Sequence, residues 1–192
     1  MQLDLMKIFD GYVRNYHTLN LSVHHGRHSF TMAEIEYFSR LGSMMGYLPF
    51  TEDTCNSTYR AMDLTWWDDF DGKYWHDFIL HLERENIFKK DFETLEKLFS
   101  NREPVPQNVI GIMSIKNEAR IEELVIEAKI MCKIKNALLI FRTNSIGNNK
   151  GYFDEVHAYL LSENKIRDNK IAYVNEISST LFMNFDENLI KI

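Results

Sequence analysis

The sequence predicts an α/β domain in which helices flank a mixed central β-sheet, an antiparallel meander followed by parallel strands. Strand-like segments with an Asp-Gly hairpin signal come first, and amphipathic helices then alternate with short apolar runs. Crossover connections between parallel strands require that alternation. With 192 residues, 45% of them hydrophobic, the chain can bury one core. We therefore expect a single domain over 1–192, with a core at 30–145, an N-terminal helix and a C-terminal extension.

Two helices are expected before the first strand. Apolar side chains recur at near-helical spacing over 2–16. The second helix should begin after Ser29 or Thr31, because either side chain can act as its N-cap. Gly46 is placed to end it, since glycine readily adopts the left-handed conformation that follows many helices.

The meander should consist of three strands, over 47–54, 57–69 and 74–85. The sequence DFDGK between the second and third strands contains the Asp-Gly pair that favours a tight hairpin. We expect these two strands to pair through that turn.

Two helices and two buried strands are expected next. Helices over 89–100 and 117–134 each precede a short apolar run, NVIGIMSI and ALLIFRT respectively. Continuous apolar runs of this length are typical of strands that are buried on both faces. We expect them to be neighbouring central strands, parallel to each other and linked by the helix over 117–134.

The C-terminal extension is predicted to contain a helix over 151–163 and an edge strand at KIAYVNEI. The loop GNNKG separates it from the central strands.

Three carboxylates can converge on one side of the meander. Side-chain alternation puts Asp63 of RAMDLTWW on one face of its strand, and Glu83 and Glu85 of FILHLERE on one face of theirs. If the hairpin pairs these strands, the acids repel one another unless a cation or a proton compensates. Such hard oxygen ligands suit Mg²⁺ or Mn²⁺, and metal-assisted hydrolysis is the chemistry that follows most naturally.

The order of helix, meander, helix and strand resembles that of the PD-(D/E)XK nuclease superfamily, which includes restriction endonucleases and DNA-repair nucleases. The matching residues are Asp63 and the triplet Glu83-Arg84-Glu85, and the resemblance covers about 30–145. It implies a restriction-endonuclease-like fold with Asp63, Glu83 and Glu85 as catalytic residues and ligands of Mg²⁺ or Mn²⁺. It also implies a magnesium-dependent endonuclease that hydrolyses DNA in defence or DNA processing, with a homodimer as the default assembly.

The sequence departs from the family pattern at the triplet's last position, where Glu85 replaces the usual lysine. Some members carry an acid there, and in others a lysine comes from the neighbouring helix. Lys97 is the obvious candidate, but at about 100° per residue it lies roughly opposite Phe88, Phe92 and Phe99. We therefore expect a minor role for Lys97 at most.

A fourth acid can come from the helix before the meander, as it often does in this family. The apolar side of that helix includes Leu41 and Met45, and Glu34 projects between them. We therefore choose Glu34 over Glu36 as a further catalytic residue.

A second hypothesis is a catalytically inactive nuclease-like fold that acts as a protein-interaction module. The net charge of −6 gives no general basic field for nucleic acid, and both this charge and Glu85 favour the second hypothesis. Local contacts with DNA remain compatible with the charge, because bound cations offset an acidic centre.

Other classes are disfavoured by what the sequence lacks. It contains no nucleophile-elbow pattern and no glycine-rich phosphate loop, so triad hydrolases and nucleotide triphosphatases are not expected. No stretch approaches the roughly 20 apolar residues needed to span a membrane. Cys55 and Cys132 lack the spacing of a zinc site and are too few for a disulfide framework, so a reducing cytoplasm is the expected setting.

Overall fold

The computed structural model describes residues 2–54, 61–100, 105–143 and 155–189. The elements follow in this order: α1 (Leu5–Asn15), the 3-10 helix η1 (Tyr16–Leu19), α2 (Arg27–Met44), β1 (Leu48–Asp53), β2 (Met62–Phe70), β3 (Trp75–Glu85), η2 (Phe88–Lys90), α3 (Asp91–Leu98), β4 (Asn108–Ile115), α4 (Glu118–Met131), β5 (Ala137–Thr143), β6 (Glu155–Ser162), β7 (Lys165–Ile177), β8 (Thr180–Asn184) and η3 (Glu187–Leu189).

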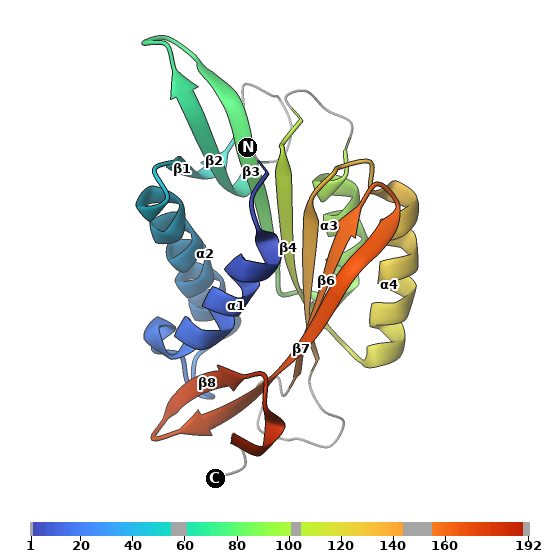
Figure 1. Ribbon diagram of the computed structural model, residues 1–192. Helices are drawn as coiled ribbons and strands as arrows, with labels where there is room; N and C mark the ends of the chain where they lie inside the picture. The colour runs from blue at the N-terminus through green and yellow to red at the C-terminus, as the bar shows by residue number, and fades with distance from the viewer. Residues whose placement is uncertain (1, 55–60, 101–104, 144–154, 190–192) are drawn as a thin grey trace.

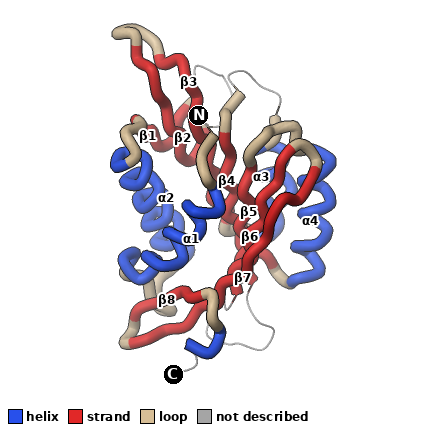
Figure 2. The backbone as a smooth tube through the Cα atoms, viewed as in Figure 1, coloured by secondary structure: helices blue, strands red, loops and turns tan. Residues whose placement is uncertain are grey.

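One mixed sheet of eight strands, in the order β1 to β8, forms the centre of the fold. The pairs β3/β4 and β4/β5 are parallel, and the other neighbours are antiparallel. Helices α1 and α2 cover one face, and α3 and α4 cover the other (Figure 1). Figure 2 shows the strands as one layer between the helices. The predicted α/β class, with a mixed sheet flanked by helices, is confirmed.

The predicted meander and crossover are both present. β1, β2 and β3 pair antiparallel in sequence order, and the turn after β2 is closed by Asp71 Oδ1, which accepts from the main-chain N–H groups of Lys73 and Tyr74 at 2.8 Å. Gly72 supplies the left-handed φ of +94° that this turn needs. β4 and β5 are parallel neighbours joined through α4, as the two apolar runs predicted.

The prediction of a helix over 151–163 is wrong, because Glu155–Ser162 forms β6; residues 151–154 lie outside the described ranges. β6 lies between β5 and β7 and buries side chains on both faces, which overrides its local helical pattern. The strand predicted at KIAYVNEI exists as part of β7, but it is not at the edge, because β8 pairs with it.

The start of α2 also differs from its prediction. The helix begins at Arg27 with Gly26 as N-cap, and no side chain caps it. The amide of Asn86, just after β3, donates to the Arg27 carbonyl at 3.1 Å and to the Thr31 hydroxyl, which ties the first turn of α2 to the end of β3 without capping it. The end of the helix is as predicted, with Gly46 in the left-handed region at φ +91°.

Within the described ranges, the helices include none that is long and apolar enough to cross a membrane.

α2 approaches the sheet closely at Gly42. A Cβ at this position would lie 2.6 Å from Nε1 of Trp66, a fully buried ring on β2. The missing side chain therefore sets the distance between α2 and the meander.

Gly42→Ala is expected to destabilise the protein. Overpacking costs about 1–3 kcal/mol, which exceeds the gain in helix propensity of up to about 1 kcal/mol. Gly11→Ala in α1 is the matched control, because its Cβ would meet only Tyr37 Oη at an ordinary 3.8 Å. Urea unfolding compares the two variants, and equal stabilities would contradict the close approach at Gly42.

Candidate functional site

Asp63 on β2 and Glu83 on β3 lie side by side on the face of the sheet that α3 covers. The register pairs Leu64 with Leu82, so Asp63 and Glu83 come next in the same antiparallel ladder. The main-chain N–H of Asp63 points to Glu83 Oε1 at 3.4 Å, and that of Arg84 donates to Asp63 Oδ2 at 2.7 Å. The alternation predicted from the sequence therefore brings these two carboxylates together.

A cavity of about 350 Å³ opens beside them, between the end of β3 and α3. The three predicted acids lie on its wall, and basic side chains join them there. Its lining residues are Asp63, Glu83, Arg84, Glu85, Lys90, Glu93, Thr94 and Lys97.

Lys97 belongs to this site, so the minor role predicted for it needs correction. Its Nζ lies 2.6 Å from Glu83 Oε2 and donates to the carbonyl of Ala61 at 2.5 Å. The prediction took Phe92 as part of the buried side of the helix, but Phe92 is 37% exposed. Leu95 and Phe99 are buried as predicted, but Leu98 is buried in place of Phe92, and this rotation of α3 turns Lys97 toward β3.

Gly111 on β4 makes this placement of α3 possible. It is the direct neighbour of Glu83 in the parallel β3/β4 pairing. A Cβ on Gly111 would lie 2.6 Å from Leu98 Cδ1. α3 therefore packs close to the sheet beside Glu83, and Lys97, the residue before Leu98, reaches that carboxylate.

Glu83 is buried and accepts from two side chains. His81 Nε2 lies 2.6 Å from Glu83 Oε1, while Lys97 holds Oε2. The sequence pattern alone predicts no role for His81, although its i,i+2 spacing from Glu83 on a strand places both side chains on one face. Glu85, at the rim, accepts from the main-chain N–H of Ile87 at 2.7 Å.

The pKa of Asp63 lies above its ordinary value. Burial is the largest cause, and the neighbouring Glu83 charge adds to it. The Arg84 N–H, Lys97 and His81 act in the opposite direction. Protein groups alone therefore leave the ionised form of Asp63 incompletely compensated.

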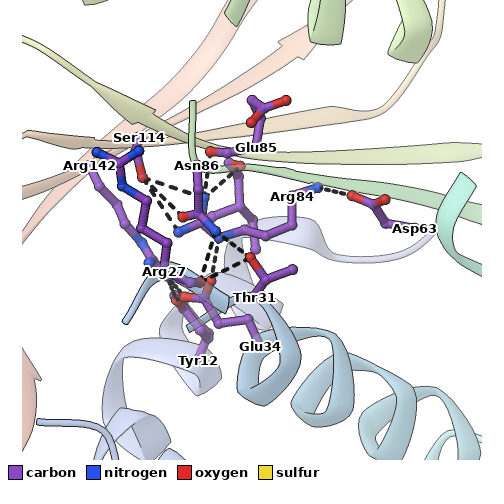
Figure 3. Close-up of polar contacts among 11 residues, drawn as sticks. Tyr12, Arg27, Thr31, Glu34, Asp63, Arg84, Glu85, Asn86, Ser114 and Arg142 are labelled. Carbon is purple, nitrogen blue, oxygen red and sulfur yellow. Dashed lines mark hydrogen bonds and ion pairs between the residues drawn. The ribbon is translucent and has the colours of Figure 1, made fainter. Parts of the chain in front are cut away.

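Glu34, the predicted fourth acid, does not line this cavity. It is fully buried on the opposite face of the sheet, where it pairs with the guanidinium groups of Arg84 and Arg142. The hydroxyl of Tyr12 also donates to Glu34 Oε1 at 2.5 Å (Figure 3). The physical reason is strand alternation, since Arg84 points away from Glu83 and Glu85 toward α2.

A different group has the tightest arrangement of possible metal ligands. Among the described residues, only Glu118, Glu155 and His157 form a set of three whose ligand atoms all lie within 4.8 Å of one another. A hydrogen bond of 3.0 Å between His157 and Glu155 accounts for part of this closeness. Asp63, Glu83 and Glu85 share one cavity, but their carboxylate oxygens do not all lie within 4.8 Å of one another.

No model of a known protein family matches the sequence, and no curated protein is significantly similar to it. The site is therefore interpreted from its own geometry.

Asp63→Asn is expected to raise the free energy of unfolding at pH 7. Burial disfavours the ionised form of Asp63, and the variant removes that charge. A carboxyl with a raised folded-state pKa contributes stability that is fully present below its ordinary value of 3.8 and is lost as the pH rises through the folded-state pKa. The difference between the variant and wild type should therefore shrink toward pH 3.

Urea unfolding between pH 3 and 8 measures this difference, with the exposed Asp168→Asn as a control that should change little. An Asp63→Asn protein less stable than wild type at pH 7 would show that the carboxylate is well compensated.

Proposed function

We propose that this chain is a divalent-cation-dependent phosphodiesterase of the PD-(D/E)XK type that hydrolyses DNA. The order α2, β1, β2, β3, α3, β4, with an antiparallel meander and β4 parallel to β3, supports this proposal. The observation that carries it is the contact of 2.6 Å between Lys97 Nζ and Glu83. In the strand triplet, Glu85 stands where the family usually has a lysine. Lys97 of α3 would take the place of that lysine.

The donor set fits a hard cation. Asp63, Glu83 and Glu85 offer only carboxylate oxygens, the ligands that Mg²⁺ and Mn²⁺ prefer. Asp63 Oδ1 accepts no hydrogen bond from any described residue. The raised pKa of Asp63 means that an added positive charge would stabilise its ionised form. These three residues would hold the ion, which when bound lowers the pKa of a water ligand and stabilises charge on a phosphodiester.

The charges around the cavity suit an anionic substrate once a cation is bound. Four carboxylates (Asp63, Glu83, Glu85 and Glu93) and two lysines (Lys90 and Lys97) line it with their side chains, so their formal sum is −2; Arg84 contributes its main chain, because its guanidinium lies on the other face. One divalent cation brings this sum to zero, which removes the net repulsion of a phosphate group. Lys97 is held by Glu83 and the Ala61 carbonyl, in a position to orient an attacking water or to donate to a phosphate oxygen.

An inactive interaction module is the second candidate, and one observation favours it. Both oxygens of Glu83 are held by protein donors, His81 and Lys97, so this carboxylate is satisfied without an ion. Each oxygen keeps a further lone-pair position, so a cation can bind beside these donors, but the carboxylate does not depend on one. Cation binding therefore separates the two candidates.

Millimolar Mn²⁺ is expected to raise the midpoint of thermal unfolding, because a ligand that binds only the folded state adds about 2.7 kcal/mol at 100 times its Kd. Asp63→Asn should lose most of this shift. His157→Ala, in the Glu118–Glu155–His157 group, is the matched control and should keep it. The reverse pattern would place the cation at that other group, and no shift in wild type would favour the inactive module.

Asp63→Asn is expected to abolish Mn²⁺-supported cleavage of duplex DNA, and Lys97→Met to lower kcat by about 10²–10³-fold, as loss of one preorganised charge-stabilising donor does. Lys89→Ala, an exposed lysine outside the cavity, should cleave like wild type. Glu85→Lys added to Lys97→Met should recover part of the activity, because it returns a lysine to the family's usual position. If wild type leaves varied DNA and RNA intact with every cation tried, the nuclease assignment is wrong.

A further inference from the structure

Four side chains form a buried ionic cluster beneath the candidate site, on the α1 and α2 side of the sheet. They are Tyr12, Glu34, Arg84 and Arg142, and the most exposed of them, Arg84, is only 6% accessible. Glu34 is central, since it pairs with both guanidinium groups and accepts from Tyr12. Arg142 also donates to the Tyr12 hydroxyl, which closes the cluster.

The cluster contains more positive than negative charges. Two guanidinium groups face one carboxylate, and Tyr12 stays neutral because burial raises its pKa, so the formal sum is +1. Burial lowers the pKa of Arg84 to about 10, which leaves it charged at neutral pH. Buried ion pairs are often no more stabilising than apolar side chains of similar size. Stability alone therefore gives little reason for this arrangement at the end of β3.

Arg84 connects the cluster to the site through its main chain. Its main-chain N–H donates to Asp63 Oδ2 at 2.7 Å, and its side-chain Nη1 donates to the carbonyl of Glu85 at 2.6 Å. Figure 3 shows Arg84 between Asp63 on one side and Glu34 on the other. One residue thus joins the α2 carboxylate to two of the proposed ligands.

The other contacts of the Arg84 guanidinium are weaker. Nη1 lies 3.4 Å from the Ile112 carbonyl and 3.5 Å from Ser114 Oγ. Among the described residues, the ion pair with Glu34, which uses Arg84 Nε, is therefore the one close contact of this side chain outside β3. Without it, the guanidinium keeps only the Glu85 carbonyl of its own strand as a close partner, and the main chain that directs the Arg84 N–H at Asp63 loses its restraint from α2.

We propose that Glu34 is a positioning residue for the cation site: through Arg84 it fixes the Asp63 carboxylate and the main chain at Glu85. This inference rests on the proposed function. Glu34 touches neither the cavity nor a ligand, and it acts only through Arg84. Supporting residues of this kind typically change metal affinity or activity by about 10–100-fold when they are replaced.

The test compares Glu34→Gln with Glu36→Gln, which removes an exposed carboxylate of the same helix that pairs with Arg40 on the surface. Calorimetric titration with Mn²⁺ should show about tenfold weaker binding for Glu34→Gln at unchanged stoichiometry, the lower end of the range for supporting residues. Partial unfolding would instead lower the stoichiometry. Glu36→Gln should bind like wild type.

Amide hydrogen exchange supplies a readout that needs no cation. In Glu34→Gln the Arg84 N–H should exchange faster than in Glu36→Gln, relative to Ile140 in the central strand β5, which reports global opening. Equal Arg84 protection and equal Mn²⁺ affinity in the two variants would overturn the positioning role while leaving the proposed function intact. A wild type that binds no Mn²⁺ would overturn the proposed function, and the positioning role with it.

A second variant covers the case in which Glu34→Gln does not fold. Removing one partner leaves two buried guanidinium groups without a carboxylate, which is strongly destabilising. Glu34→Gln combined with Arg142→Met leaves only Arg84 charged and restores the formal sum of +1. This double variant still lacks the Arg84 anchor, so the same faster Arg84 exchange and weaker Mn²⁺ binding are expected, and wild-type values would overturn the inference.

Discussion

The two-residue period of β3 is the constraint on which the candidate site depends. Glu83 and Glu85 face the layer of α3, and Arg84 between them faces α2. A slip of one residue in the pairing with β4 would exchange these faces. The carboxylates would then meet the buried ionic cluster, and the guanidinium would enter the cavity. Correct register is therefore a condition for any function of this site, whether it binds a cation or a partner protein.

The second condition is the position of α3, which packing decides. Leu98 occupies the space that Gly111 leaves over β4, and the adjacent Lys97 then extends to Glu83. A lysine loses considerable side-chain freedom when it is held by two acceptors. Its pairing with a buried carboxylate compensates a charge that would otherwise be costly. Packing of one leucine against one glycine thus determines the electrostatics of the cavity.

The sequence predicted the parts of this structure that local patterns determine. The meander, its Asp-Gly turn, the parallel pair β4/β5 and the shared face of Asp63 and Glu83 all follow from periodicity and turn chemistry. The rotation of α3 did not follow, because Phe92 and Leu98 are both apolar and only the shape of the sheet at Gly111 decides between them. Glu34 was correctly expected to point inward, but its partner Arg142 lies far away in the sequence, so no local pattern revealed the cluster. β6 was missed because its strand pairing comes from β5 and β7 on either side.

The positions of the buried ionisable groups, which are costly to keep charged, bear on whether the site is active or vestigial. Three costly features surround Asp63 and Arg84: a carboxylate with a raised pKa, a pair between the buried Glu83 and the half-buried Lys97, and a buried cluster with excess positive charge. Of the five Asp, Glu and Arg residues that are buried among the described residues, Glu34, Glu83, Arg84 and Arg142 belong to this region, and Asp91 is the exception. An interaction module would use the outer surface and would gain nothing from ionisable groups held in this way beneath it. Perturbed and mutually supporting charges in one cavity are typical of sites that act on a ligand, so their concentration here supports catalysis over a vestigial fold.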